Sequence, residues 1–311
     1  MKKKVLITGS SGFVGHQLLK QLSKKNHNFE LLLTSRKSKP FNDIKVIKWD
    51  LEKNTSHTNL TFDILIHLAA ETKNFNKMWA VNFVGTKNII RSAIKSGVKK
   101  IIFLSSISAL KYKLDSKKIN LYGKTKSIAE DFIKRECIKN KIDYIILRPT
   151  NILGLNHDRL PFLNLIKSIK NGSFTFLGES DRAESNYISN KDVCRCIIFF
   201  LENKCNSSSY ILNDSVKLIQ IVRAISNELL VKVPKRSIPI SIGKIAAKIC
   251  DFIQNLFQIS LPYNSDRFLE LINTTKFNGN IISDDTNFIY KNKTLDNIIQ
   301  LTKFYLKNKY V

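Results

Sequence analysis

The first half of the chain alternates between short apolar runs and segments in which apolar residues recur at helical spacing. The apolar runs lie at residues 4–7, 29–34, 45–49, 63–68, 100–104 and 144–147. Between them, the segments 13–23, 79–95 and 121–140 gather apolar side chains on one face of a helix. Because the apolar runs do not alternate with polar residues, we expect strands that helices cover on both faces. The pattern predicts an α/β fold of the Rossmann type, a doubly wound parallel sheet.

The second half of the chain is less regular, and proline and glycine residues interrupt its pattern. We expect residues 1–155 to form a nucleotide-binding domain, to which residues 186–213 return. Residues 156–185 and 214–311 are then expected to form a smaller C-terminal substrate-binding lobe.

One stretch of that lobe, at residues 242–257, has helical spacing and many apolar residues. Lys244, Lys248 and Asp251 give it a polar side. Contact with a membrane surface is one interpretation of such a helix, but packing within the lobe is favoured.

A glycine-rich turn follows the first apolar run, and its three glycines are spaced three residues apart. The first allows a tight turn, the second lets the backbone approach a pyrophosphate, and the third lets the helix pack on the strand. The N terminus of the following helix offers free N–H groups to an anion. This context favours a dinucleotide site over a purely structural turn. The residues expected to bind the cofactor are Gly9, Ser11, Gly12, Phe13, Val14 and Gly15.

The end of the second predicted strand bears on which nicotinamide cofactor is bound. NAD enzymes usually carry an acidic residue there for the ribose diol, whereas this chain has Ser35, Arg36 and Lys37. Arg36 could pair with the 2′-phosphate of NADP. The alternative is a solvated loop cation, because cations are abundant throughout the chain. The cofactor is therefore expected to be NAD or NADP, with a slight preference for NADP.

Three residues form the candidate catalytic set. Tyr122 and Lys126 lie four positions apart near the start of a predicted helix, so they share one face. Ser106 follows the fifth predicted strand, at the edge of the sheet where ligands bind in such folds. A nearby ammonium group would lower the pKa of the Tyr122 phenol, which could then exchange a proton with a substrate oxygen. Lys126 could also bind the nicotinamide ribose, and Ser106 could hydrogen-bond the reacting oxygen.

The chain carries a formal net charge of +26. Because the lysines are spread over the whole sequence rather than clustered, we expect no nucleic-acid partner. The excess charge should instead attract anionic substrates such as nucleotide diphosphates.

The five cysteines are an odd number without a regular framework, which favours a reducing compartment over a disulfide scaffold. Cys194 and Cys196 lack a second pair of ligands nearby, so no metal site is expected. No apolar run of about 18 residues exists, so we expect no integral membrane segment and a cytoplasmic location.

Further segments complete a recognisable pattern. They lie at residues 49–51, 67–70, 81–86, 102–106, 147–154 and 186–193. With the glycine loop and the Tyr-x-x-x-Lys pair, they make the chain resemble the extended short-chain dehydrogenases/reductases. More narrowly, it resembles the NAD-dependent epimerase/dehydratase group that acts on nucleotide sugars.

The resemblance implies roles for individual residues. Asp50 and Leu51 would contact the adenine, and Pro149 would lie beside the nicotinamide. Asn151 would bind the substrate diphosphate. The loop beside the cofactor would consist of Leu68, Ala69 and Ala70. Relatives often pair through the helix that carries Tyr122, so the resemblance also allows a homodimer.

Three departures from the family pattern narrow the function. Dehydratases carry acidic residues after the catalytic serine, but here Ile107 and Ser108 follow it, so 4,6-dehydration is not expected. The stretch between the serine and the tyrosine is shorter than in many epimerases. The arginine that often grips the substrate diphosphate would fall near Ser185, and Arg182 is the nearby candidate to replace it.

Three functions follow from these residues. The first is an NAD(P)-dependent nucleotide-sugar epimerase, which the resemblance places in surface polysaccharide synthesis. The second is an NADPH-dependent reductase of a keto sugar or another carbonyl, which Arg36 favours. The third is a cofactor-binding scaffold without catalysis, which the complete Ser106, Tyr122 and Lys126 set disfavours.

Overall fold

The structure is a computed structural model that divides into two compact units. It describes residues 2–311 except 25–28, 37–43, 54–59, 115–119, 156–159, 180–182, 205, 258–264, 266–267, 270–271 and 273–274. Unit 1 comprises Met1–Ile152, Asn190–Asn213 and Asn278–Lys291. Unit 2 comprises Leu153–Ser189, Asp214–Phe277 and Asn292–Val311.

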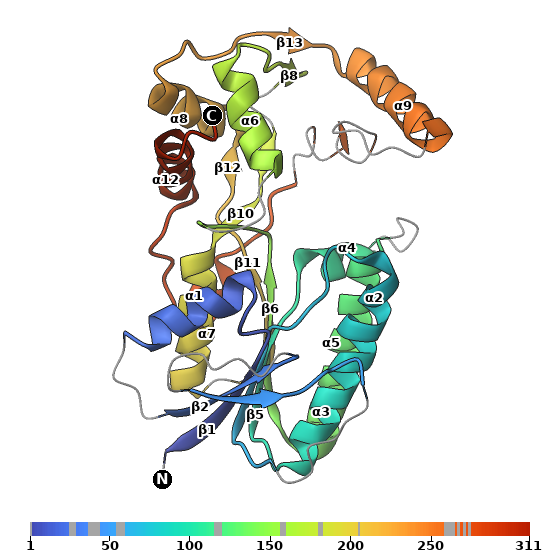
Figure 1. Ribbon diagram of the computed structural model, residues 1–311, viewed down its shortest axis with the longest axis vertical. Helices are drawn as coiled ribbons and strands as arrows, with labels where there is room; N and C mark the ends of the chain where they lie inside the picture. Colours follow the sequence, from blue (N-terminus) through green and yellow to red (C-terminus); the bar gives the residue numbers. More distant parts are fainter. Residues whose placement is uncertain are drawn as a thin grey trace. The chain divides into compact units, whose positions relative to one another are not determined.

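Unit 1 is built on a seven-stranded sheet with the order β11-β6-β5-β4-β1-β2-β3 (Figure 1). Its strands are β1 (Lys3–Thr8), β2 (Phe29–Ser35), β3 (Lys45–Lys48), β4 (Ile64–His67), β5 (Lys100–Leu104), β6 (Asp143–Pro149) and β11 (Ser208–Leu212). All neighbouring pairs run parallel. The doubly wound Rossmann-type sheet predicted from the apolar runs is confirmed. The strand order reverses between β1 and β4, and open α/β sheets bind ligands at such a point.

Helices cover both faces of this sheet. The helices of unit 1 are α1 (Phe13–Leu22), α2 (Phe75–Trp79), the π-helix η1 (Ala80–Gly85), α3 (Thr86–Lys95), α4 (Ile107–Leu114), α5 (Leu121–Asn140), α7 (Asn190–Glu202) and α11 (Ile281–Thr286). One face carries α1 and α7, which pack against each other, and the other carries α3 and α5 (Figure 1). Leu6 and Leu65 of the sheet share a buried cluster with Ile89 of α3 and Phe132 of α5. This burial explains why the strands are apolar without alternation.

The segment Asn278–Lys291 lies with unit 1, although the sequence division grouped it with residues 214–311. The backbone N–H of Lys291 donates to the Asp192 carboxylate at 3.1 Å. Gly279 lies so close to Asn213 that an added Cβ would come within 2.2 Å of the Asn213 carbonyl oxygen. These contacts join parts of the chain that are far apart in sequence, which no local pattern reports.

Unit 2 is mainly helical. Its elements are α6 (Leu160–Lys170), β8 (Phe176–Leu177), β9 (Glu184–Ser185), β10 (Tyr187–Ser189), β12 (Val216–Lys217), α8 (Leu218–Leu229), β13 (Ser237–Ile238), α9 (Ile240–Phe257) and α12 (Thr294–Lys307). A further strand, β7 (Asn151–Leu153), follows β6. The core of the unit joins Ile166 of α6, Ile225 of α8 and Ile298 of α12. Over the part of the chain that the structure describes, no helix is both long and apolar enough to cross a membrane.

Candidate active site

The glycine loop closes tightly between β1 and α1. Gly9 has a φ of 71°, and an added Cβ there would lie 2.6 Å from the backbone nitrogen of Ala69. At Gly15, an added Cβ would lie 2.2 Å from the Gly9 carbonyl oxygen. The N–H of Gly12 donates to that same carbonyl at 3.0 Å and caps the loop where α1 begins. The backbone therefore leaves no room for a side chain at Gly9 or Gly15.

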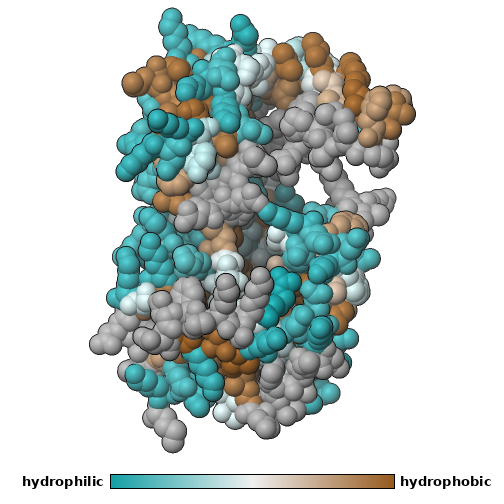
Figure 2. Space-filling view, viewed as in Figure 1, coloured by the Kyte–Doolittle hydropathy of each residue, from teal (hydrophilic) through white to brown (hydrophobic). Residues whose placement is uncertain are grey.

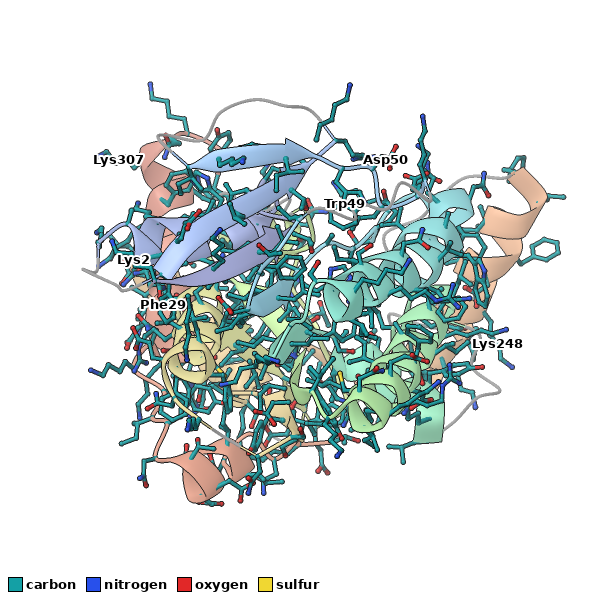
Figure 3. The ribbon with its side chains drawn as sticks, turned by 90° about the horizontal axis from the view of Figure 1, so that it is seen from below. Lys2, Phe29, Trp49, Asp50, Lys248 and Lys307 are labelled. Atoms are coloured by element: carbon teal, nitrogen blue, oxygen red, sulfur yellow. The ribbon has the colours of Figure 1, made fainter. Side chains whose placement is uncertain are left out.

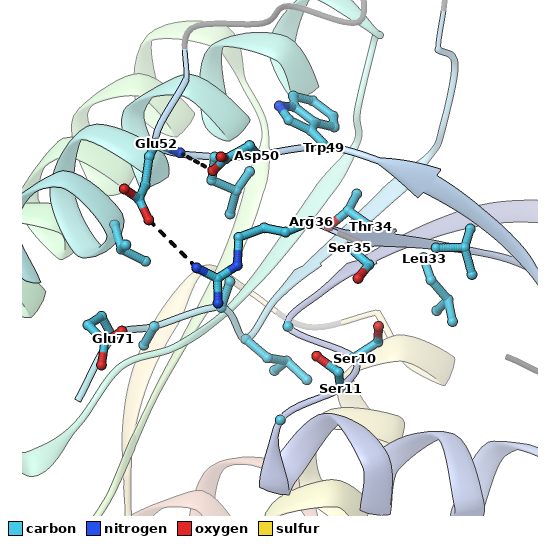
Figure 4. A pocket seen from close by; sticks show the side chains of 18 residues that line it. Ser10, Ser11, Leu33, Thr34, Ser35, Arg36, Trp49, Asp50, Glu52 and Glu71 are labelled. Atoms are coloured by element: carbon cyan, nitrogen blue, oxygen red, sulfur yellow. Dashed lines mark hydrogen bonds and ion pairs between the residues drawn. The ribbon is translucent and has the colours of Figure 1, made fainter. Parts of the chain in front are cut away.

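A cavity of about 630 Å³ opens above this loop, at the carboxyl edge of the sheet (Figure 4). Most of its wall comes from four segments, at residues 9–12, 33–36, 49–52 and 68–71. They belong to the glycine loop and to the ends of β2, β3 and β4. The volume lies within the range of small-molecule and cofactor sites. The glycine loop exposes backbone without side chains, and the N terminus of α1 lies at the edge of the cavity. Both features suit the pyrophosphate of a dinucleotide.

Carboxylates that the sequence did not single out share this cavity with Arg36. The Glu52 carboxylate lies 3.8 Å from the Arg36 guanidinium, which is 68% exposed (Figure 4). The backbone N–H groups of Asn74 and Lys73 hold the pKa of Glu71 below its usual value, and Arg36 adds to this effect. The end of β2 lacks a carboxylate, but the fold supplies two acidic groups from other segments.

The start of α5 brings Tyr122 against Ser106. The Asn120 side chain caps the helix by accepting from the Gly123 N–H at 3.1 Å. A Cβ on Gly123 would lie 2.6 Å from the Ser108 carbonyl oxygen, so glycine allows α5 to approach the start of α4. The Ser106 side chain hydrogen-bonds the half-buried Tyr122 phenol. Burial raises the pKa of Tyr122 to about 12, while the bond from Ser106 acts in the opposite direction.

Lys126 is buried beneath this pair at the end of β5. Its ammonium donates to the Leu104 carbonyl at 2.6 Å and lies 4.1 Å from the centre of the Phe103 ring. Burial lowers the pKa of Lys126 to about 7, and the negative charge of Glu130 opposes that change. The expectation that Lys126 lowers the pKa of Tyr122 is not met in this structure. Burial shifts both pKa values because it disfavours the charged form of each group.

Buried polar residues fix the loop after β4. His67 is wholly buried, with Nδ1 2.6 Å from the Thr8 hydroxyl and Nε2 3.0 Å from the Thr86 hydroxyl. Since Thr86 donates its proton to the Asn82 carbonyl at 2.7 Å, we assign the Nε2–H tautomer to His67. Burial lowers the pKa of His67 to about 3, so the ring is neutral. His67 is a structural residue that ties β1 and β4 to η1 and α3.

Comparison with known proteins decides the family. The model of the NAD dependent epimerase/dehydratase family matches residues 5–213. The chain belongs to this family. It is therefore an NAD(P)-dependent enzyme of the extended short-chain dehydrogenase/reductase type, as its motifs predicted.

Individual relatives span nearly the whole chain. One is the N-acetyl-alpha-D-glucosaminyl-diphospho-ditrans,octacis-undecaprenol 4-epimerase of Escherichia coli O157:H7, which is 26% identical over 90% of this chain and 88% of its own length. The UDP-glucose 4-epimerase of Vibrio cholerae is 23% identical over 86% and 90%. Among solved structures, the enzyme WbmG of Bordetella bronchiseptica, in complex with NAD and UDP, is 15% identical with a TM-score of 0.71, over 100% and 97% of the chains. The similarity to WbmG shows that the two chains share a fold.

The predicted cofactor residues fall into two groups in the structure of this family member. The residues that line the cavity are Gly9, Ser11, Gly12, Arg36, Asp50, Leu51, Leu68, Ala69 and Ala70. Phe13 and Val14 open α1, and the buried Pro149 ends β6. Among the predicted substrate residues, Asn151 begins β7, and Arg182 lies outside the described residues.

A buried ionic cluster that the sequence motifs did not indicate lies behind the candidate catalytic set. Glu130 lies one helical turn after Lys126 on α5 and is wholly buried. It accepts a hydrogen bond of 2.5 Å from Ser105, the residue before Ser106. It also pairs with Arg148 of β6. The four-residue spacing from Lys126 was the one signal that could have revealed Glu130, because it repeats the spacing of Tyr122 and Lys126.

Proposed function

We propose that this enzyme is a sugar 4-epimerase that acts on a nucleotide-diphosphate sugar in the synthesis of surface polysaccharide. The observation that carries the proposal is the contact between Ser106 and Tyr122 at the carboxyl edge of the sheet, with Lys126 one turn below. It is supported by relatives named as 4-epimerases that align with nearly the whole chain.

The proposed reaction depends on proton exchange between the Tyr122 side chain and the reacting sugar oxygen. When bound, a nicotinamide dinucleotide supplies reversible hydride transfer. Ser106 holds the reacting sugar oxygen by a hydrogen bond. As the hydroxyl at that carbon becomes a carbonyl, its proton passes to the phenolate of Tyr122, and the phenol returns a proton when the hydroxyl forms again. The new hydroxyl has the opposite configuration because the keto sugar turns its other face before reduction.

In this proposal, the charge of Lys126 stabilises the phenolate only during proton transfer, because burial keeps the resting Tyr122 protonated. A pKa of about 12 keeps Tyr122 protonated at neutral pH, which suits proton donation to a keto sugar. Proton acceptance needs the positive charge of Lys126, whose own pKa is about 7. The buried carboxylate of Glu130 helps to keep that charge in place.

A direct assay tests the epimerase. The purified enzyme, freed of nucleotide and supplied with a trace of NAD, is incubated with UDP-glucose or UDP-N-acetylglucosamine, and the sugar protons are followed by NMR. We expect the 4-epimer to appear without net change in reduced cofactor. A sugar attached to a polyprenyl diphosphate is the second substrate to test, because the Escherichia coli relative is named for one.

A keto-sugar reductase is the second candidate, and Arg36 favours it. Its guanidinium lies in the wall of the cavity, where it could pair with the 2′-phosphate of NADP. With NADPH and a keto sugar in place of NAD and UDP-glucose, a reductase would consume one NADPH for each keto sugar, and with NAD alone it would form no epimer. Binding of NAD or NADP without epimerisation or reduction would contradict both candidates and support the scaffold.

A further inference from the structure

Helix α9 of unit 2 turns its large apolar side chains toward solvent. The exposed residues are Ile242 at 53%, Ile245 at 60%, Ile249 at 54%, Phe252 at 66% and Leu256 at 61%. They recur every three or four residues, so they form one continuous stripe along the helix. Figure 2 shows this apolar surface in brown where Figure 1 draws α9. We call these five residues the α9 stripe.

The buried side of α9 carries small residues instead. Gly243 is buried, and Ala247 is 1% exposed. The expectation that the apolar residues of this stretch pack within the lobe is therefore wrong for its largest members. Soluble proteins rarely leave a continuous apolar patch uncovered, so such a patch marks an interaction surface.

Positive charge lies beside the α9 stripe. Lys244 and Lys248 are exposed on the helix itself, and Figure 3 draws Lys248 at its outer edge. Three further exposed cations, Lys232, Lys235 and Arg236, precede β13 in the chain. No aspartate or glutamate occurs between Glu228 and Asp251. The helix surface thus combines exposed apolar side chains with two positive charges.

We propose that α9 docks this protein on the surface of an anionic lipid bilayer. The α9 stripe enters the boundary between headgroups and acyl chains, and the flanking lysines contact lipid phosphates. Amphipathic helices that combine an apolar face with basic residues bind membranes in this way. Each cation near an anionic bilayer adds to such binding. The proposal does not depend on which reaction the active site carries out.

The charge pattern favours a bilayer over a second copy of this chain. In a symmetric dimer through α9, Lys244 and Lys248 of one copy would lie close to those of the other. Like charges brought together in this way oppose association. An anionic surface instead neutralises both lysines and covers the apolar residues at once.

Vesicle flotation of the full-length protein tests the proposal. The vesicles contain phosphatidylcholine alone or phosphatidylcholine with phosphatidylglycerol. We expect binding to the anionic vesicles, weaker binding at high salt, and little binding to the neutral ones. Lys244→Gln with Lys248→Gln should weaken binding about thirtyfold.

A matched pair of variants separates docking from general attraction of a basic protein. Ile245→Asp places a carboxylate in the α9 stripe, whereas Ile289→Asp places one at a residue of unit 1 that is 68% exposed. Both change the net charge equally. We expect Ile245→Asp to reduce vesicle binding about tenfold or more and Ile289→Asp to leave it nearly unchanged. Circular dichroism checks that both variants fold.

Three outcomes would overturn the proposal. One is no flotation with anionic vesicles at low salt. Another is equal loss of binding in the two aspartate variants, which would assign binding to net charge alone. The last is a dimer in sedimentation equilibrium that Ile245→Asp dissociates, without any vesicle binding, which would assign the α9 stripe to a second copy.

Discussion

The Glu130 carboxylate accepts two hydrogen bonds from the Arg148 guanidinium, at 3.0 Å from Nε and 2.7 Å from the terminal nitrogen. This bidentate pair joins α5, which carries Tyr122 and Lys126, to β6. Because Glu130 also accepts from Ser105, the same carboxylate holds the end of β5 next to Ser106. One buried charge thus joins β6 to α5 and to the end of β5, the two elements that position the candidate catalytic residues.

Removing the charge of Glu130 should impair this arrangement. Glu130→Gln leaves Arg148 without its carboxylate, and breaking such a buried pair typically costs about 3–5 kcal/mol of unfolding free energy. The variant should also lower the pKa of Lys126, because Glu130 raises it. As pH rises, the Lys126 ammonium should then lose its proton at a lower pH than in the wild type, and the activity that needs it should be lost at that lower pH. Urea unfolding and a pH–rate profile measure the two effects, and an unchanged profile would remove Glu130 from the catalytic arrangement.

Replacing the phenol should abolish turnover without affecting the cofactor. Tyr122→Phe deletes the proton donor and keeps the ring, so activity should fall about 10²–10⁴-fold. Binding of NAD or NADP, followed by fluorescence titration, should stay within the error of the wild type. Normal turnover in Tyr122→Phe would refute the acid–base role.

Two glycines of the loop should respond differently to substitution. Gly12→Val adds a side chain where the nearest backbone atom, the Gly9 carbonyl oxygen, lies 3.2 Å from the added Cβ, so we expect folding with lost cofactor binding. Gly15→Ala forces Cβ within 2.2 Å of that oxygen, so it should destabilise the fold itself. Calorimetric titration and thermal unfolding distinguish these outcomes. Wild-type cofactor affinity in Gly12→Val would show that the loop is not the pyrophosphate site.

Arg36 should affect the affinity for NADP and not for NAD. Arg36→Gln removes a charge that could pair with the 2′-phosphate, and such bonds typically contribute about 1.5–3 kcal/mol. Arg91→Gln, at an exposed residue of α3, is the matched control. Equal affinities for NADP in the two variants would mean that Arg36 forms an ion pair with Glu52 and does not bind the cofactor.

Burial of Lys126 should make stability depend on pH. Its pKa is about 7 in the folded protein and 10.5 as the unperturbed value, so the unfolded chain binds more protons between these values. This lysine therefore destabilises the fold fully below pH 7, and its penalty disappears as pH rises to 10.5. Lys126→Met should gain stability over the wild type most at low pH, by up to a few kcal/mol. Urea unfolding across this range measures the gain, and a difference that is constant with pH would contradict the assignment.

The sequence alone determined the features that depend on neighbouring residues. The glycine spacing predicted the tight turn between β1 and α1, and helix α5 runs over the same residues, 121–140, that its pattern predicted. The uniformly apolar runs predicted a sheet covered on both faces. These signals are local because a turn, a helix and a strand each impose a period or a conformation on a short stretch of chain.

Only the tertiary structure decided which distant groups meet. The pairing of Arg36 with Glu52 and of Glu130 with Arg148 follows from strand order and helix packing, which spacing does not report. The pKa values of Tyr122 and Lys126 follow from burial, which is a property of the assembled fold. Helix α9 is a further example. Its periodicity predicted an apolar face, but it did not predict that this face is exposed to solvent while the small residues are buried. Periodicity describes one element, whereas solvation and charge pairing depend on everything packed around it.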